Sequence, residues 1–338
     1  MLPQRPADAD SSIRLTDNDA AVARLSAVQK NYLSDPFIKA LVPRAHLQPP
    51  RPPLINIGTY VRTVAIDDLV DQWIQIASQE GKTCQITGPQ REDISAYIEV
   101  DFSENTTKKA MAIRKSKELS AVLGQDTKLA LGGTALHSAV YHLVPADLRE
   151  PPAIALSSLI ATLEGSSKPP LDTSLPTLLI FECVLVYMSP ESSTSLVQWF
   201  SEHFARQTAL GAIVYEMFGL EDSFGRVMVN NLKARNVTLP GAAPYPTLAS
   251  LPSRFLSLDF TAAHALTLRD IRKTYIDPGE LDRIAQLEFL DEIEELDLVL
   301  QHYAITWGLS VPSTTKSMSS WFQWGLKKKQ RTEADDSF

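Results

Sequence analysis

The chain has 338 residues, of which 44% are hydrophobic, so it is long and apolar enough for one large α/β domain or two smaller domains. Its formal net charge of -8 argues against nucleic acid as a partner, because phosphate binding depends on Lys and Arg side chains. The sequence contains no apolar run long enough to cross a bilayer and no signal-peptide core, which favours a cytoplasmic protein that does not bind membranes. Its two cysteines and six histidines lack metal-ligand spacing, so no metal site is expected.

The first expected element is a helix near the N-terminus. Residues 1–15 are polar and are expected to be disordered. Thr16, with an acidic residue three positions later, resembles a capping box, and apolar residues follow it at helical spacing. Arg24 lies on another face of this helix. Five prolines within residues 43–53 then predict an extended strap.

A second helix is predicted over residues 66–78, where apolar residues recur on one stripe. Arg62 stands among apolar residues just ahead of it. This arginine is a candidate clamp for an anion, and the alternative is an ordinary surface salt bridge.

Two strand-like runs follow, at residues 84–87 and 97–102. The second run ends in acidic residues, and a carboxylate at that place can accept hydrogen bonds from both hydroxyls of a ribose. Asp101 and Glu99 are therefore the candidate ribose ligands.

A helix over residues 108–123 and a third strand over residues 139–144 come next. Asp147 follows that strand and precedes a helix predicted over residues 152–163. Two roles are open for Asp147, namely capping this helix or accepting a hydrogen bond from an adenine amine. Capping is the commoner role for such a residue in isolation.

Residues 175–188 form the longest apolar run and are predicted to be a central strand that is covered on both faces. Glu182 and Cys183 interrupt this run, and a buried carboxylate needs a partner. Because ligands of open α/β sheets collect at the carboxyl ends of the strands, Glu182 is a candidate ligand residue. The alternative is a carboxylate satisfied by a neighbouring cation or by backbone amides. Ser189, followed by proline, predicts the start of the next helix.

Another strand is expected to carry Tyr215 and Glu216 near its end. The remaining expected elements are a strand over residues 211–218, helices over residues 221–235 and 279–295, and a last strand over residues 302–308. Because strands alternate with helices, the chain is predicted to be α/β, with a doubly wound and mostly parallel sheet. Residues 310–338 are expected to be a polar, basic and disordered tail, with a nuclear import signal or a membrane-touching helix as alternatives.

Several stretches resemble the leucine carboxyl methyltransferases, which use S-adenosylmethionine to methylate the C-terminal leucine carboxylate of the type 2A protein phosphatase catalytic subunit. The matching stretches lie within roughly residues 16–308 and read YLSDPFI, INIGTYVRT, YIEVDF, ADLR, LPTLLIFECVLVYM, YEMFGLEDSFGRVM, RIAQLEFLDEIEEL and HYAITWG. The resemblance implies a class I S-adenosylmethionine-dependent methyltransferase fold over residues 16–309, with an N-terminal helical segment and substrate-side insertions. It also implies a cytoplasmic location, with the nucleus as an additional one.

The resemblance also implies roles for individual residues. The methionine carboxylate and the incoming substrate would lie near Arg24 and Arg62, and Arg62 would be the catalytic residue. Asp101 would bind the ribose, Asp147 and Leu148 would surround the adenine, and Glu182 would lie beside the methionine. Tyr215 and Glu216 would face the phosphatase tail. The family also uses lysine at the position of Arg24, which supplies a cation with different geometry.

One stretch departs from the family pattern. The family's first strand runs into a glycine-rich loop of the form LGAG and a helix, whereas this chain reads TGPQREDISA at residues 87–96. Nine residues, 88–96, separate the two strands, and a parallel crossover normally needs a dozen or more. Because the resemblance resumes at Tyr97, we hypothesise a deletion, either natural or introduced at an exon boundary. Loss of this wall would weaken the binding of S-adenosylmethionine.

Three other functions are compatible with the sequence. The first is a catalytically impaired homologue that binds the phosphatase but lacks the glycine-rich cofactor loop. The second is a methyltransferase that acts on a modified tRNA base, although those relatives carry a C-terminal repeat domain. The third is a carboxyl methyltransferase for small molecules, which the same fold would also support.

Overall fold

A computed structural model describes residues 10–85, 94–162, 169–205, 207–312 and 318–329. Its strands are β1 (Cys84–Gln85), β2 (Ile94–Asp101), β3 (Lys128–Ala130), β4 (Ala135–His137), β5 (Tyr141–Pro145), β6 (Thr177–Glu182), β7 (Leu210–Met217), β8 (Ala262–Thr267) and β9 (Tyr303–Ser310). Its α-helices are α1 (Ser11–Gln29), α2 (Ile38–Leu41), α3 (Pro53–Gln79), α4 (Ser103–Lys115), α5 (Lys117–Leu123), α6 (Pro152–Ala155), α7 (Ser157–Ile160), α8 (Pro190–Phe204), α9 (Ser223–Ala234), α10 (Ser253–Leu256), α11 (Leu268–Thr274), α12 (Pro278–Ala285), α13 (Ile293–Gln301) and α14 (Met318–Trp321). Short 3-10 helices are η1 (Ala45–Leu47), η2 (Leu131–Gly133), η3 (Leu185–Tyr187), η4 (Pro240–Ala242) and η5 (Leu248–Ser250).

The strands form one sheet in the order β3-β4-β5-β2-β1-β6-β7-β9-β8. Strands β5, β2, β1, β6 and β7 are parallel, whereas β9 runs antiparallel between β7 and β8. A short antiparallel hairpin, β3 and β4, extends the other edge. This arrangement confirms the predicted α/β fold with a mostly parallel sheet.

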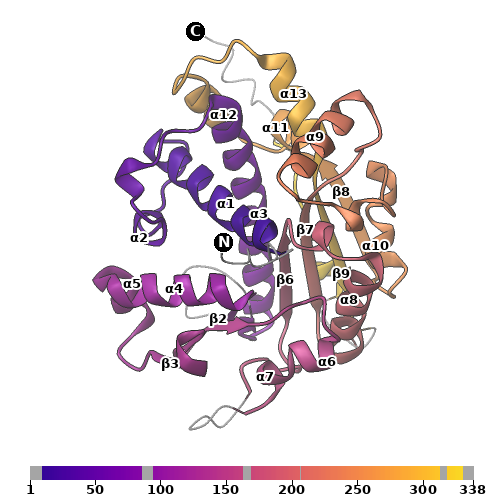
Figure 1. Cartoon of the computed structure of the whole chain (residues 1–338). Coiled ribbons are helices and arrows are strands. Elements are labelled where there is room, and N and C mark those ends of the chain that lie inside the picture. Colours follow the sequence, from indigo (N-terminus) through magenta and orange to yellow (C-terminus); the bar gives the residue numbers. More distant parts are fainter. Residues whose placement is uncertain (1–9, 86–93, 163–168, 206, 313–317, 330–338) are drawn as a thin grey trace, which may run out of the picture.

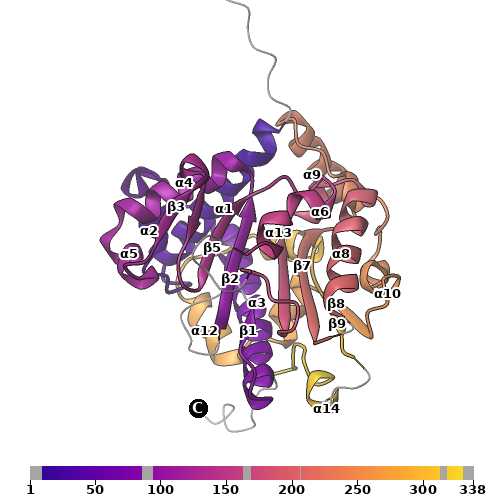
Figure 2. The same cartoon turned by 90° about the horizontal axis from the view of Figure 1, so that it is seen from below.

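Helices cover both faces of the sheet (Figures 1 and 2). On one face, α3 packs against β7 together with α11, α12 and α13. On the other face, α8 and α10 pack against the alternate residues of β6 and β7. Gly211 permits the closest approach of α3, because a Cβ atom there would lie 2.5 Å from the Trp73 ring. The two apolar layers hold the sheet rigidly under the ends of its strands.

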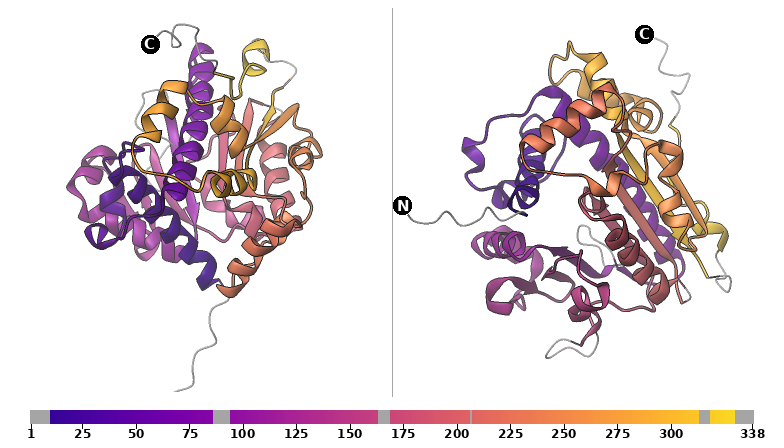
Figure 3. Two further views of the ribbon diagram at one scale, coloured as in Figure 1. Left: turned by 90° about the horizontal axis from the view of Figure 1, so that it is seen from above. Right: turned by 45° about the vertical axis from the view of Figure 1, so that its right-hand side comes forward.

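The N-terminal helix is longer than the sequence predicts. It begins at Ser11 with Asp10 as its N-cap, so Thr16 is not the N-cap and residues 11–15 are helical rather than disordered. Residues 1–9 lie outside the described residues. The Thr16 hydroxyl instead donates to the carbonyl of Ile13 within the helix. Helix α1 contacts α3 and also reaches α4 (Figure 3).

Helix α3 begins at Pro53 rather than at residue 66. Proline suits the first helical position, and buried residues such as Ile57, Tyr60 and Val61 extend the apolar stripe N-terminally. The β-branched residues and Gly58 in this stretch lower its helix propensity, but burial of the stripe overrides that preference. As a consequence, Arg62 lies within the helix and not ahead of it.

The C-terminal segment is packed and not disordered over residues 318–329, which corrects the sequence prediction. Trp321 is fully buried, and its indole N–H donates to Glu80 at 2.6 Å. The Trp324 indole N–H donates to the carbonyl of Leu69 at 2.8 Å. Both rings contact Trp73 of α3, with centroids 4.5 and 5.0 Å away. Aromatic burial against α3 therefore anchors this segment.

Strand β1 is short. Its residue Gln85 pairs with Ala96 of β2 and with Thr177 of β6, near the beginnings of both neighbouring strands. Among the described residues, no strand lies between the later parts of β2 and β6. A cavity of about 130 Å³ is lined there by β2 and β6 residues, including Val100 and Phe181. The predicted departure from the family loop at residues 87–96 falls largely outside the described residues.

No helix among the described residues is both long enough and apolar enough to cross a membrane.

Candidate functional site

The strand ends bring most of the predicted residues to one edge of the sheet. Asp101 is the last residue of β2, and Glu182 is the last residue of β6. Asp147 follows Pro145, where β5 ends, and Tyr215 lies just before the end of β7. Because these strands are parallel, their carboxyl ends meet at the edge where α/β sheets bind ligands.

Arg62 of α3 points toward this edge. Its Nε atom lies 3.8 Å from a Glu182 carboxylate oxygen, and its guanidinium stands 5.3 Å from the centre of the Tyr215 ring. Its side chain is only 15% exposed, and its Nε has no hydrogen-bond partner among the described residues. Burial would lower the pKa of Arg62, but Glu182 and Tyr215 raise it above its ordinary value. Arg62 is therefore a charged donor with unused bonding capacity.

Glu182 lies at the end of β6 because the predicted strand over residues 175–188 is shorter than expected. Cys183 has a φ angle of 50°, which turns the chain out of the strand and toward η3. Its backbone N–H still donates to the carbonyl of Tyr215 at 2.7 Å. A non-glycine residue with a positive φ angle costs free energy, and such residues are often found at functional sites. The turn leaves the Glu182 side chain 45% exposed, so this carboxylate is not buried within an apolar strand.

Two stacked tyrosines form a wall beside Arg62. The rings of Tyr215 and Tyr303 lie 5.4 Å apart and are nearly parallel, with an interplanar angle of 14°. Tyr303 starts β9 opposite Met217, so the antiparallel strand brings it to the same sheet edge. Burial raises the pKa of both hydroxyls, which keeps them neutral near pH 7.

Asp101 is held in a fixed orientation at the end of β2. One carboxylate oxygen accepts from the Phe102 backbone N–H at 2.7 Å, and both oxygens lie within 3.3 Å of the Asn105 amide nitrogen. Burial raises the pKa of Asp101, and these two hydrogen bonds oppose the increase. The carboxylate is thus positioned to accept from hydroxyl groups at the sheet edge.

Glu99 has a different environment, although it was the second candidate for a ribose. It binds Lys109 and accepts from Tyr97 at 2.9 Å and from Tyr141 at 3.1 Å. Burial raises the pKa of Glu99, but Lys109 and the two tyrosine hydroxyls together lower it by more, so the pKa lies below its ordinary value. Because protein groups occupy this carboxylate, Asp101 is the better candidate.

Asp147 does not cap the helix that follows it, since Pro151 is the N-cap of α6. Its carboxylate instead accepts from the backbone and side chain of Arg149, with one contact of 2.6 Å. Arg149 also makes two contacts of 2.7 Å with Asp10 at the start of α1. Hydrogen bonds from Arg149 lower the pKa of Asp147. Leu148, the next residue, packs into the apolar layer and lines the cavity between β2 and β6.

Arg24 of α1 reaches the same region by way of α3. Its Nε donates to Asp35 at 2.6 Å, and its Nη1 donates to the Thr63 hydroxyl at 3.4 Å. Thr63 is the neighbour of Arg62 in α3, so Arg24 contacts the helix that carries Arg62.

Glu216 does not join the site, contrary to the sequence prediction. Successive residues of a strand point to opposite faces, so Glu216 faces away from Tyr215. It is 1% exposed, and both of its oxygens accept from Arg254 at 2.7 and 2.8 Å. This buried ion pair belongs to the core on the α10 side of the sheet.

The residues at the sheet edge fit S-adenosylmethionine in their chemistry. Asp101 can accept from a ribose, whereas both oxygens of Asp147 already accept from Arg149, so the adenine role expected for Asp147 is not supported by its contacts. Arg62 has an unpartnered buried Nε, which suits a carboxylate, and Glu182 can accept from an ammonium group. Residues 86–93, which follow β1, lie outside the described residues.

Sequence reasoning missed Tyr303, Arg149 and Asp10. Tyr303 lies within the HYAITWG stretch noted above, but nothing local indicates that an antiparallel strand returns it to the site. Asp10 and Arg149 are far apart in the chain, and only the fold brings them together.

Comparisons with known proteins agree with this geometry. A family model described as leucine carboxyl methyltransferase matches residues 89–201. Leucine carboxyl methyltransferase 1 of Cryptococcus neoformans is 41% identical over 349 residues, covering 91% of this chain and 97% of the relative. The protein of that name from Aspergillus fumigatus is 38% identical, covering 88% of this chain and 83% of the relative. A homologue from Arabidopsis thaliana is 31% identical, covering 89% and 90%. The Cryptococcus alignment is longer than this 338-residue chain, so the relative contains residues with no counterpart here.

Proposed function

Because the chain belongs to the leucine carboxyl methyltransferase family, we propose that it transfers a methyl group from S-adenosylmethionine to the C-terminal leucine carboxylate of the type 2A protein phosphatase catalytic subunit. The observation that carries this proposal is the buried Arg62, whose unpartnered Nε lies between Glu182 and Tyr215 at the carboxyl edge of the sheet.

The chemistry makes modest demands on the protein. A terminal carboxyl group has a pKa of about 3.3 to 3.7, so it is ionised at neutral pH and needs no general base. The bound cofactor would supply an electrophilic methyl group. The side chains would then act by holding the carboxylate in line with that group and by excluding water.

Each part of the site has a defined task in this proposal. Arg62 pairs with the carboxylate of the substrate, while Arg24 binds the methionine carboxylate of the cofactor. Tyr215 and Tyr303 form a dry wall on one side of Arg62. Glu182 fixes the Arg62 guanidinium and binds the cofactor's ammonium group.

The direct test is a methyl-transfer assay. The purified chain is incubated with methyl-labelled S-adenosylmethionine and the phosphatase catalytic subunit, with a subunit lacking its terminal leucine as the control. We expect alkali-labile label, as a methyl ester requires, only on the intact subunit. Stable label, or equal label on both subunits, would contradict carboxyl methylation of the terminal leucine.

A second function is favoured by one specific observation. Residues 86–93 are all that separates β1 from β2, whereas a parallel crossover normally needs a dozen or more residues. A homologue with an impaired cofactor site would still bind the phosphatase. Phosphatase binding without any methylation, in the same preparation, would support this alternative.

A further inference from the structure

The first half of α1 lies against the rest of the molecule without being buried in it. Residues 11–20, all within the described part of the chain, are exposed or half-buried, whereas the buried residues of α1 begin at Val22. A helix of a globular protein normally gains most of its stability by packing an apolar face. The first half of α1 therefore depends on other contacts for its position.

Ion pairs connect this half of α1 to both sides of the sheet. Asp19 binds Arg235, the C-cap of α9, and lies 3.7 Å from Arg51. Arg14 lies 3.7 Å from Glu104 of α4. Because α4 follows β2 and α9 follows β7, these contacts span the carboxyl edge of the sheet.

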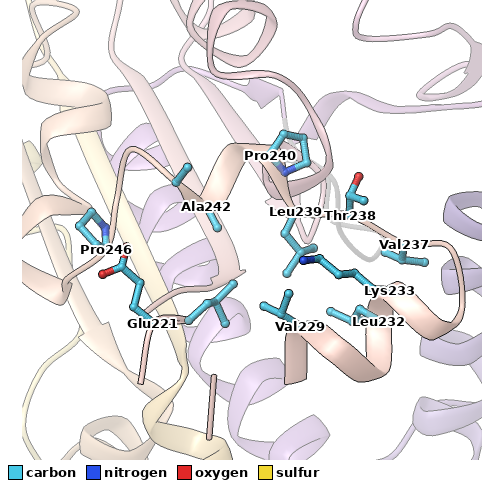
Figure 4. A pocket seen from close by; sticks show the side chains of 13 residues that line it. Glu221, Val229, Leu232, Lys233, Val237, Thr238, Leu239, Pro240, Ala242 and Pro246 are labelled. Carbon is cyan, nitrogen blue, oxygen red and sulfur yellow. The ribbon is translucent and has the colours of Figure 1, made fainter. Parts of the chain in front are cut away.

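The support at α9 is firm. Arg235 leads into residues 237–246, several of which line a pocket of about 350 Å³ beside α9 (Figure 4). A Cβ atom on Gly241 would lie 2.2 Å from the carbonyl oxygen of Leu185, so this segment packs directly against η3. Asp19 thus contacts a fixed part of the surroundings of the site.

Arg149 ties the start of α1 to the candidate functional site. Its Nη1 and Nη2 donate to the two oxygens of Asp10 at 2.7 Å each. Its Nε and Nη2 donate to Asp147 at 2.9 and 2.6 Å. The guanidinium also lies 5.3 Å from the centre of the Phe102 ring, and Phe102 follows Asp101. Asp10, Arg149 and Asp147 together form the Arg149 network.

Helix α1 passes the candidate cofactor residues. From Asp10 to Arg24 the helix covers about 21 Å, because an α-helix rises about 1.5 Å per residue. Burial is the main cause that raises the pKa of Asp101, and the charge of Asp17 in α1 adds to this increase, so the two carboxylates lie near each other. The helix thus borders Arg24, Asp101 and Asp147.

The Arg149 network is strong enough to hold α1 and exposed enough to open. Its hydrogen bonds join charged groups through a planar guanidinium fork, which makes them stronger than neutral hydrogen bonds. The side chains of Arg149 and Asp10 are nevertheless 34% and 26% exposed, so water and salt can reach this ion pair. Breaking it exposes none of the buried residues of α1, which begin at Val22.

The closed position of α1 has a consequence for ligand exchange, which rests on the proposed function. We propose that the Arg149 network holds the first half of α1 closed over the carboxyl edge, and that S-adenosylmethionine enters the site when this network opens. Arg149 is then a positioning residue, because it acts through α1 and does not react.

The first measurement is amide hydrogen exchange of the 338-residue chain without cofactor. Asp10→Ser removes the ion pair with Arg149, and serine is as good an N-cap residue as aspartate. Exchange over residues 11–20 should become roughly fivefold faster or more, while exchange over α3 stays unchanged. Wild type in 1 M NaCl should approach the variant, because the Debye length falls to about 3 Å. Asp126→Ser, at an exposed turn, removes the same charge and should leave exchange unchanged.

The second measurement is the association rate of S-adenosylmethionine, followed by stopped-flow tryptophan fluorescence. The rate should rise in Asp10→Ser by about the same factor as the exchange, because only the open population admits the ligand. Equal exchange in wild type and Asp10→Ser would overturn the proposal. An unchanged or slower association rate in Asp10→Ser would overturn it too, since α1 would then not control entry.

Failure of the proposed function has a different signature. It would appear as no binding of S-adenosylmethionine by the wild-type chain or either variant. The exchange comparison, which needs no cofactor, would then still support or overturn closure of α1 by the Arg149 network.

Discussion

At the scale of single residues, Arg62 is the side chain on which the proposed chemistry most depends. Its position in α3 fixes its backbone, Glu182 lies 3.8 Å from its Nε, and the Tyr215 ring covers one face. A guanidinium that is oriented before the substrate arrives loses little entropy when it binds a carboxylate.

We predict that Arg62→Ala lowers kcat/KM for the phosphatase subunit by about 100-fold or more, because an oriented charged donor is removed. Arg62→Lys should retain more activity, since it keeps the charge but loses the planar fork. The measurement is the steady-state rate of methyl transfer by the wild-type chain and the two variants, at a temperature at which all three are folded. Unchanged turnover of Arg62→Ala would remove this residue from the mechanism.

A second residue-scale prediction concerns the buried pair of Glu216 and Arg254. Burial raises the pKa of Glu216, whereas Arg254 lowers it. In Arg254→Met this opposing effect is lost, and the folded state then keeps a proton that the unfolded state releases near its ordinary pKa. Stability therefore falls as the pH rises above that ordinary value.

We expect Arg254→Met to lose about 3 to 5 kcal/mol of unfolding free energy at pH 8, because the unfolded state has released a proton there that the buried Glu216 favours keeping. The loss should be smaller at pH 5. Urea unfolding at the two pH values is the measurement, and the double variant Glu216→Gln with Arg254→Met should show much less pH dependence. An equal loss at both pH values would contradict a buried carboxylate as the cause.

The residue scale also shows how far sequence reasoning reached. The place of Asp101 at a strand end could be predicted because an acidic residue follows an apolar run there. Glu182 was expected inside a longer strand over residues 175–188, which the turn at Cys183 ends early. Tyr303 could not, because its place depends on an antiparallel strand that pairs far along the chain. Glu216 was misplaced because the alternation of a strand separates it from Tyr215.

At the scale of elements, α3 links the candidate site to the C-terminal segment. Arg62 of α3 lies at the candidate site, and Trp73 of the same helix contacts both Trp321 and Trp324 of the C-terminal segment. The composition of residues 310–338 indicated disorder, but apolar burial of two tryptophans outweighs the polar residues around them over residues 318–329. The first helix and α3 were likewise underestimated, because tertiary packing extends them beyond their local signals.

We predict that Trp321→Ala destabilises the protein by about 3 to 5 kcal/mol, because it empties a fully buried site and removes the hydrogen bond to Glu80. The matched control is Phe322→Ala, the next residue, whose side chain is exposed and should cost less than about 1 kcal/mol. Thermal unfolding, monitored by circular dichroism of the backbone, measures the destabilisation of both variants. Similar midpoints for the two variants would show that this segment does not anchor α3.

For the whole molecule, the mostly parallel α/β sheet could be predicted from the sequence, but the order of its strands could not. Alternating strands and helices indicated the parallel sheet, whereas β8 and the β3–β4 hairpin have weak local signals and were missed. The short spacing between the first two strands indicated missing sequence. The alignment with the Cryptococcus relative shows that this chain lacks some residues of that relative. The predicted deletion near residues 87–96 falls largely outside the described residues and stays a prediction.

The proposed function requires that the carboxyl edge of this sheet binds S-adenosylmethionine. Isothermal titration calorimetry of the cofactor into the folded 338-residue chain tests it most directly, with Asp101→Ala as the site variant and Asp126→Ala, at an exposed turn, as the control. We predict saturable binding that Asp101→Ala abolishes and Asp126→Ala preserves. No binding by the folded wild-type chain, or binding that is indifferent to Asp101, would contradict the account.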